Sequence, residues 1–114
     1  MTHYDTIIVG AGPAGLTAGI YLSRAKQKVL ILDTGIAGGQ MVLTHEIANY
    51  PGYESIGGYM LSMKMKEQAE SFGCEIKTNV QFETYKLTDS EKQITLKTGE
   101  EYSSNSIVLT TGGS

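Results

Sequence analysis

The sequence predicts a three-layer α/β domain with a central parallel sheet and a small antiparallel β-meander. Two observations carry this prediction: a strand–helix–strand pattern in residues 4–33, and an alternating apolar pattern over residues 80–102. The length of 114 residues is that of one ordinary domain. Ten of the 14 glycines fall within the first 58 residues. Such clustering indicates backbone that turns tightly or lies against a ligand.

Charge and hydropathy exclude several classes of function. Nine Lys and Arg residues stand against twelve Asp and Glu residues, and no basic run is present, so we expect no nucleic-acid partner. Apolar stretches are too short for a membrane span, and the N-terminus lacks the pattern of a secretory signal. A single cysteine forms no internal disulfide. We therefore expect a cytoplasmic protein without a membrane partner.

The first elements form a βαβ unit. Residues 4–9 read as a buried strand, because Ile7, Ile8 and Val9 are consecutive and β-branched. Residues 13–25 read as a helix whose first turn suits a proline. Residues 29–32 form a second buried strand. A strand–helix–strand unit of this length predicts a right-handed crossover between parallel strands.

A long loop and a second helix follow. Residues 34–58 show little periodicity, and their length and apolar content favour a functional loop. Residues 59–72 read as a helix that ends at Gly73. Its expected core stripe has helical spacing: Leu61, Met65, Ala69 and Phe72.

The remaining chain reads as short strands. We expect one over residues 75–78, preceded by Cys74 as a small core residue. The alternation over residues 80–102, with turns at 88–90 and 98–99, predicts an antiparallel meander of three strands. A separate last buried strand is expected over residues 106–110.

The strongest motif lies between the first strand and the first helix. It follows the G-x-G-x-x-G pattern: Gly10, Ala11, Gly12, Pro13, Ala14 and Gly15. Gly10 permits the tight turn, Gly12 lets a pyrophosphate approach, and Gly15 lets helix and strand pack closely. The helix N-terminus offers free N–H groups to phosphates. The motif therefore predicts a Rossmann-like dinucleotide-binding site, in which we expect Pro13 and Ala14 to contact the cofactor.

Asp33 narrows the choice of dinucleotide. It ends the second strand, 18 residues after Gly15, where a carboxylate accepts hydrogen bonds from the adenosine ribose. It would repel a 2′-phosphate, which favours FAD or NAD over NADP. The long loop and the meander favour FAD, because the flavin ring needs protein around it.

Several segments together resemble the N-terminal FAD-binding segment of thioredoxin reductases and their flavoprotein relatives. In order they are the motif at 10–15, Asp33 (more often Glu in the family), Gly38-Gly39-Gln40, Asn49-Tyr50-Pro51-Gly52 and Thr111-Gly112. The second glycine pair with its glutamine and the Asn-Tyr-Pro-Gly run are the specific part. They favour thioredoxin reductases over monooxygenases and lipoamide dehydrogenase-type enzymes.

The resemblance also implies contacts to FAD. It places Gly38, Gly39 and Gln40 against the flavin or its ribityl chain, and Asn49 near the isoalloxazine ring. It implies a backbone contact from Val80 to adenine. It also implies that Thr111 and Gly112 close over the adenosine and pyrophosphate end of FAD.

The resemblance implies a larger parent enzyme. In this family an NADPH-binding domain with a redox Cys-x-x-Cys follows, and a C-terminal segment then completes the flavin site. Residues 1–114 contain neither, so we expect them to be the N-terminal part of an FAD-binding domain, an incomplete domain that is inactive alone and has no catalytic residue. The parent would pass hydride from NADPH through FAD to a disulfide of a thioredoxin-like protein.

Other readings stay open at this stage. A ferredoxin- or flavodoxin-NADP reductase of the same build would lack the dithiol. A stand-alone FAD- or NAD-binding module, or a scaffold that binds nothing, would also fit parts of the pattern. His3 and His45 lack the spacing of metal ligands, so we expect no metal site. Without the C-terminal segment the last strand would lie at a sheet edge, so we expect a homodimer or other self-association. Because that segment also completes the flavin site in the family, we expect the isolated chain to bind flavin weakly or not at all.

Overall fold

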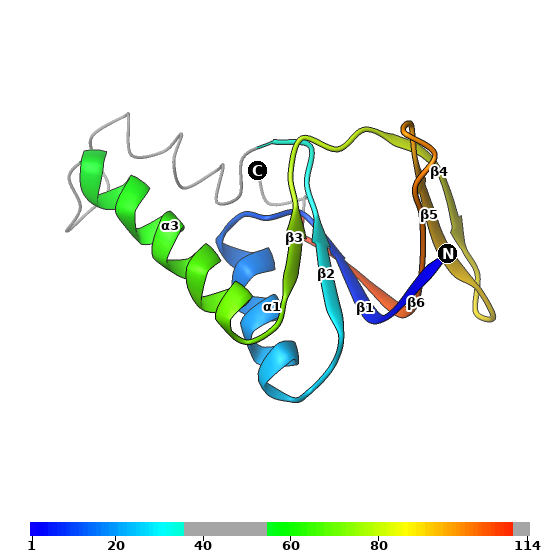
Figure 1. The fold of residues 1–114 in the computed structure, drawn as a ribbon, viewed down its shortest axis with the longest axis horizontal. Helices are drawn as coiled ribbons and strands as arrows, with labels where there is room; N and C mark the ends of the chain where they lie inside the picture. The colour runs from blue at the N-terminus through cyan, green and yellow to red at the C-terminus, as the bar shows by residue number, and fades with distance from the viewer. Residues whose placement is uncertain (36–54, 111–114) are drawn as a thin grey trace.

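The structure, a computed structural model, describes residues 1–35 and 55–110. Within them, six strands form one sheet in the order β3-β2-β1-β6-β5-β4, and two helices lie on one side of it (Figure 1). The elements in chain order are β1 (Thr2–Val9), α1 (Pro13–Arg24), β2 (Val29–Leu32), α3 (Ser55–Ser71), β3 (Glu75–Lys77), β4 (Phe82–Leu87), β5 (Lys92–Leu96) and β6 (Glu101–Leu109). Neither described helix is long and apolar enough to cross a membrane.

The parallel part of the sheet confirms the predicted βαβ unit. Strand β1 is central and pairs in parallel with β2 on one side and β6 on the other. Ile8 lies opposite Ile31 and Val108 in these two ladders. Strand β3 adds to the outer side of β2, again in parallel. Consecutive β-branched residues suit these strands because both faces of the sheet are covered.

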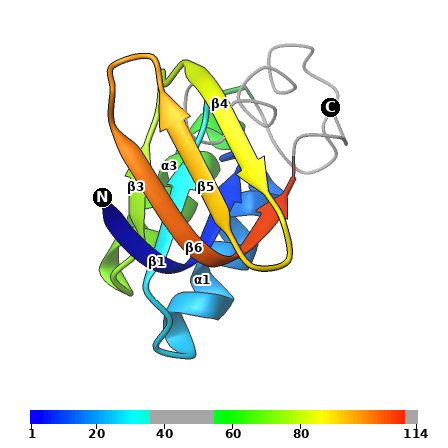
Figure 2. The same ribbon diagram turned by 90° about the vertical axis from the view of Figure 1, so that its right-hand side faces the viewer.

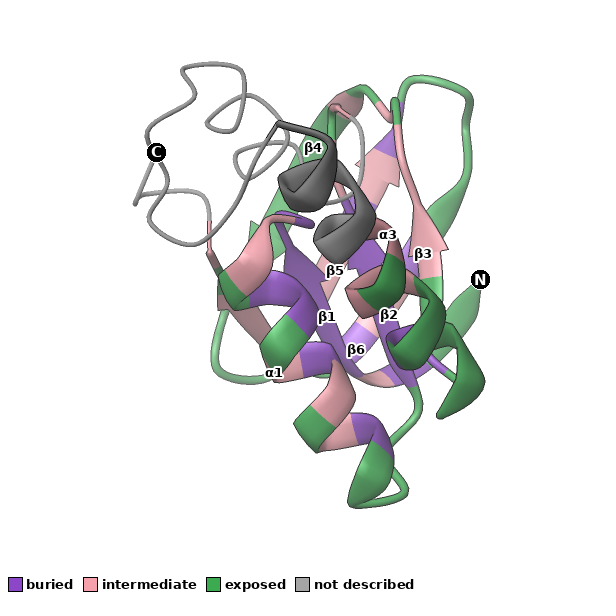
Figure 3. Ribbon diagram, turned by 90° about the vertical axis from the view of Figure 1, so that its left-hand side faces the viewer, coloured by how far each residue is buried: buried purple, intermediate pink, exposed green. Residues whose placement is uncertain are grey.

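Three layers result, as the sequence predicts. Helices α1 and α3 cover one face, and buried residues lie both in the strands behind them and along α1 (Figure 3). That core contains Ile8, Ala11, Leu16, Val29, Ile31, Ala69 and Cys74. On the other face, the bent antiparallel strands fold across the sheet (Figure 2), over a core of Tyr4, Ile7, Val9, Leu30, Leu32, Ile94, Leu96 and Tyr102. Cys74 is a buried core residue, as expected.

The end of the meander corrects one prediction. The third meander strand and the last buried strand are one continuous strand, β6. Its first part pairs antiparallel with β5, while its length runs parallel to β1. The polar run at 103–105 resembles a turn in sequence, but hydrogen bonds accommodate it within the strand. Ser103 Oγ lies 2.8 Å from His3 Nδ1, and Ser104 Oγ donates to the Ser106 carbonyl at 2.8 Å.

The second helix also differs from its prediction. Helix α3 begins at Ser55 rather than at 59, so the predicted loop is wrong over 55–58; a glycine pair there resembles a loop signal. Residues 36–54 lie outside the described residues. Ala69 is buried as predicted, but the prediction of a core position for Phe72 is wrong, because its side chain is 42% exposed. It follows the last helical residue, and its ring lies 5.7 Å from the Arg24 guanidinium carbon.

One stretch of β6 has a partner on a single side. Among the described residues, residues 106–109 pair with β1 only, because the β5 ladder covers residues 101–103. Leu109 is 63% exposed there. The expectation that the last strand lies at a sheet edge is therefore wrong for β6 as a whole, which lies between β1 and β5, and only residues 106–109 have one strand partner within the described part of the chain.

Candidate functional site

The predicted site residues meet where the parallel strands end. The Gly10 N–H donates to the Leu32 carbonyl at 2.8 Å, which ties the end of β1 to the end of β2. The Val80 N–H donates to the Asp33 carbonyl at 3.0 Å, which ties β2 to the connection after β3. The N–H of Thr110, directly after β6, donates a hydrogen bond to the carbonyl of Val9, the last residue of β1. In parallel α/β sheets, ligands bind outside these carboxyl ends.

Gly10 and Gly12 shape the turn between β1 and α1. Gly10 has a φ of 115°, a conformation that glycine adopts without strain. Gly12 is the N-cap of α1, where no side-chain hydrogen bond caps the helix, and Pro13 lies in the first turn of α1. Ala14, in the first turn of α1, is exposed. The first N–H groups of α1 have no partners within the helix, so they are available to an anion.

Gly12 and Gly15 are glycines for different reasons. A Cβ on Gly15 would lie 1.9 Å from the Gly10 carbonyl oxygen, so helix and turn could not pack as they do. At Gly12 no described atom outside the two neighbouring residues lies within 4 Å of a Cβ. Its φ of −74° and ψ of −174° suit any residue. In dinucleotide-binding turns of this pattern, the space at the second glycine, next to the helix N-terminus, is where the pyrophosphate lies.

Asp33 lies at the end of β2 and is partly buried. Its Oδ1 accepts a hydrogen bond from the Thr34 N–H at 3.0 Å, which orients the carboxylate. A carboxylate has several further acceptor positions. The Asp33 carboxylate can therefore accept hydrogen bonds from two ribose hydroxyls, while the Asp33 backbone carbonyl accepts the hydrogen bond from the Val80 N–H.

Val80 is more restricted than the sequence suggests. Its N–H is used by the Asp33 carbonyl, so its own carbonyl is the group left for an adenine contact. Its side chain packs against the core beneath the meander. Val80 also lines a hollow of about 530 Å³ with residues that include Lys77, Leu96 and Glu100. No residue of the 10–15 motif lines this hollow.

Six predicted cofactor contacts lie outside the described residues and stay predictions: Gly38, Gly39, Gln40, Asn49, Thr111 and Gly112.

One residue that the sequence did not predict as a site residue, Thr110, lies at the site. Thr110 Oγ1 is within hydrogen-bond distance of the Val9 and Gly10 carbonyls. It stands immediately before the Thr-Gly pair, but no spacing rule marks it.

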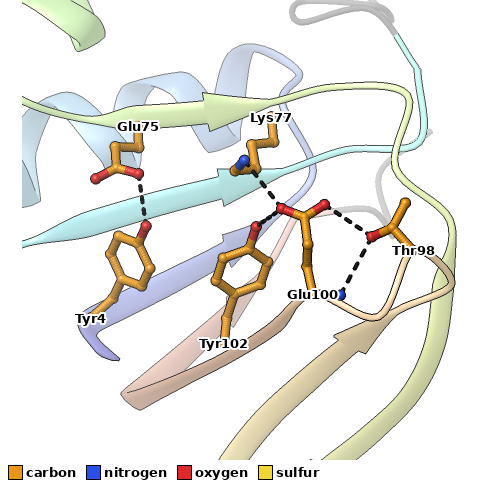
Figure 4. Close-up of polar contacts among 6 residues, drawn as sticks. All are labelled: Tyr4, Glu75, Lys77, Thr98, Glu100 and Tyr102. Carbon is orange, nitrogen blue, oxygen red and sulfur yellow. Dashed lines mark hydrogen bonds and ion pairs between the residues drawn. The ribbon is translucent and has the colours of Figure 1, made fainter. Parts of the chain in front are cut away.

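A second polar cluster lies over the meander side of the sheet (Figure 4). Glu100 accepts hydrogen bonds from the Tyr102 hydroxyl at 2.6 Å and the Thr98 hydroxyl at 2.9 Å, and Lys77 Nζ lies 3.4 Å away. Beside it, the Tyr4 hydroxyl donates to Glu75 at 2.7 Å. These contacts join β3 to the turn before β6, and every group shown has a partner. We attribute a structural role to the cluster.

The contacts shift the titration of this cluster. The hydrogen bond from Tyr102 holds the pKa of Glu100 below its usual value, with help from Thr98 and Lys77. Burial, followed by the bond to Glu75, raises the pKa of Tyr4 far above its usual value. Burial also raises the pKa of Tyr102. The cluster is thus most stable with neutral tyrosines and an ionised glutamate.

Comparison with known proteins agrees with this geometry. The chain is 43% identical over 110 residues to thioredoxin reductase of Bacillus subtilis strain 168, an alignment that spans 96% of this chain and 34% of that protein. Its fold matches Lactococcus lactis thioredoxin reductase with a TM-score of 0.77 at 42% identity, over 93% of this chain and 34% of that one.

A more distant structural match is a ferredoxin-flavin thioredoxin reductase from Clostridium acetobutylicum, with a TM-score of 0.72 at 27% identity over 96% of this chain and 37% of that one. This chain thus spans about a third of the length of the relatives it matches. Residues 4–114 match the family described as pyridine nucleotide-disulphide oxidoreductase. With the glycine turn, the strand-end aspartate and the fold in agreement, the chain belongs to that family.

Proposed function

We propose that this chain holds the adenosine diphosphate part of FAD in a thioredoxin reductase-like flavoenzyme. The observation that carries the proposal is the free space at Gly12 beside the N-terminus of α1. The α1 N–H groups would bind the pyrophosphate, and Asp33 would accept hydrogen bonds from the ribose hydroxyls. The Val80 carbonyl is the acceptor that adenine would meet.

The chemistry of such an enzyme belongs to its cofactor. The cofactor that these residues would hold, FAD, would supply the hydride and electron-transfer chemistry between NADPH and a disulfide, in an enzyme whose partner is a thioredoxin-like protein. The residues of this chain would bind and orient FAD and would supply no acid, base or nucleophile. The sequence holds one G-x-G-x-x-G motif and one cysteine, so an NADPH site and a redox dithiol would come from other residues. A cytoplasmic location stays a prediction.

A titration of the chain with ADP, FAD and FMN by calorimetry tests the proposal. We expect ADP and FAD to bind and FMN, which lacks the adenosine, to bind far more weakly. Gly12→Val should remove binding, and Thr84→Val, a change on the exposed face of the meander, should not. Equal binding of FMN and ADP would contradict the proposal, and so would unchanged affinity in Gly12→Val.

A ferredoxin-linked enzyme is the second candidate, favoured by the similarity to the ferredoxin-flavin thioredoxin reductase. Both candidates use the same FAD site in this chain and differ in the electron donor. In an enzyme that contains this chain, anaerobic bleaching of the flavin near 450 nm by NADPH would support the first candidate. Bleaching by reduced ferredoxin alone would support the second.

A further inference from the structure

Thr110 joins the end of β6 to the glycine turn through its side chain and its backbone. Its Oγ1 lies 3.0 Å from the Val9 carbonyl oxygen and 3.1 Å from the Gly10 carbonyl oxygen. Its N–H donates to the Val9 carbonyl at 2.9 Å. The hydroxyl therefore reaches beyond the β1–β6 ladder and contacts the first glycine of the motif.

The Gly10 carbonyl is enclosed between α1 and Thr110. The position that a Cβ on Gly15 would take lies 1.9 Å from the Gly10 oxygen and 3.0 Å from Thr110 Oγ1. All peptide bonds described are trans. In a planar trans peptide the C=O and the next N–H point in opposite directions, so the direction of the Gly10 carbonyl also sets that of the Ala11 N–H.

This carbonyl needs an anchor because Gly10 is conformationally free. Without a Cβ, Gly10 is restricted in ψ less than any other residue, so on its side of the peptide a rotation of the carbonyl meets little intrinsic resistance. In the structure, the Gly10 oxygen is not among the atoms within 4 Å of the Cβ position on Gly12. A carbonyl oxygen turned toward that space would repel phosphate oxygens, because both are acceptors with partial negative charge.

We propose that Thr110 is a positioning residue for the dinucleotide site: its hydroxyl holds the Gly10 carbonyl against α1 and keeps the phosphate space beside Gly12 free of an acceptor oxygen. The proposal rests on the proposed dinucleotide-binding function and names a residue that acts through the turn. The proposed role is exerted through the Gly10 carbonyl and requires no contact between Thr110 and the ligand.

Three variants separate the hydroxyl from the shape of the side chain. Thr110→Val keeps the shape and removes the donor, Thr110→Ser keeps the donor, and Thr84→Val repeats the same exchange on the exposed meander. Calorimetry with ADP is done at a temperature where each variant is folded. A lost neutral hydrogen bond predicts ADP affinity about three- to tenfold weaker in Thr110→Val. Thr110→Ser and Thr84→Val should match the parent chain.

Amide hydrogen exchange by NMR tests the same contact without a ligand. In Thr110→Val we expect faster exchange at Gly10, whose N–H bonds Leu32, and at Ala11, with unchanged exchange at the buried Ile94. Thr110→Ser should exchange like the parent. Unchanged exchange at Gly10 and Ala11 in Thr110→Val would overturn the proposal, as would a uniform rise that includes Ile94, which indicates a loss of global stability.

The two measurements also distinguish this proposal from the function it rests on. If the parent chain binds no ADP, the dinucleotide function of the chain fails, and with it the effect proposed for Thr110 on phosphate binding, whatever the exchange rates show. If the parent binds ADP and Thr110→Val binds equally well, only the role of Thr110 fails. Weaker binding together with local exchange, both restored by serine, would support it.

Discussion

Gly15 faces Gly10 so closely that a Cβ on Gly15 would lie 1.9 Å from the Gly10 carbonyl oxygen. A Cβ on the nearby Gly12 would have no described atom within 4 Å outside the two neighbouring residues. Two glycines of one motif thus have separate roles, one in packing α1 against the turn and one in leaving space for a ligand. Substitutions at the two positions should therefore have different consequences.

Gly15→Ala should destabilise the fold. The added methyl would force the turn and α1 apart, and overpacking of this kind costs about 1–3 kcal/mol in free energy of unfolding. Urea denaturation followed by circular dichroism measures the loss. Gly12→Ala is the matched control and should unfold close to the parent chain. Equal stability of the two variants would contradict the packing role of Gly15.

Gly12→Val should abolish ADP and FAD binding while the chain stays folded. The valine side chain would occupy the space that we assign to the pyrophosphate, and no described atom outside the two neighbouring residues lies within 4 Å of its Cβ position. Calorimetric titration of parent and variant measures binding, and circular dichroism checks the fold. An affinity equal to that of the parent would remove Gly12 from the phosphate site.

Asp33→Ala should weaken ADP binding by about 1.5–3 kcal/mol, the range for hydrogen bonds to a charged group. Any residual binding of FMN, which has no adenosine, should be unaffected. Asp89→Ala removes the same charge from an exposed turn and is the control. A loss for FMN as large as that for ADP would show that Asp33 acts through the fold.

Stability should fall at alkaline pH because of the tyrosines. Burial raises the folded-state pKa of Tyr4 and Tyr102 above the usual value of 10.0. A raised pKa contributes stability that is complete below the unfolded pKa and is lost as pH rises toward the folded pKa. Urea midpoints should therefore decline above about pH 10. Tyr4→Phe should flatten this decline, and an unchanged slope would contradict the assignment.

The isolated chain should bind FAD weakly and self-associate. Among the described residues, 106–109 pair with β1 only, and Leu109 is exposed at this open edge. Such edges promote pairing with another chain. Size-exclusion chromatography with light scattering, run with and without FAD, measures both properties. Leu109→Lys should reduce association, whereas Tyr21→Lys, at an exposed position on α1, should not. A monomer with one tightly bound FAD would contradict this prediction.

The sequence by itself determined the features that depend on neighbouring residues. The β-branched run before Gly10, the glycine spacing through Gly15 and the acidic end of β2 at Asp33 predict the βαβ unit and the dinucleotide site. These signals are local, because apolar periodicity and glycine positions are read along a continuous segment. The structure confirms the fold, and the family match confirms the resemblance.

Only the tertiary structure decided which distant groups meet. In the structure, two predicted strands form the single strand β6, and the Val80 N–H donates a hydrogen bond to the Asp33 carbonyl. Thr110 contacts Gly10, which lies 100 positions away in sequence. The polar residues 103–105 did not predict a strand. They are part of β6 in the structure, where the Ser103 hydroxyl contacts His3 on β1 and the Ser104 hydroxyl donates to the Ser106 carbonyl. Such pairings depend on register between strands far apart in the chain, and no local pattern records that register.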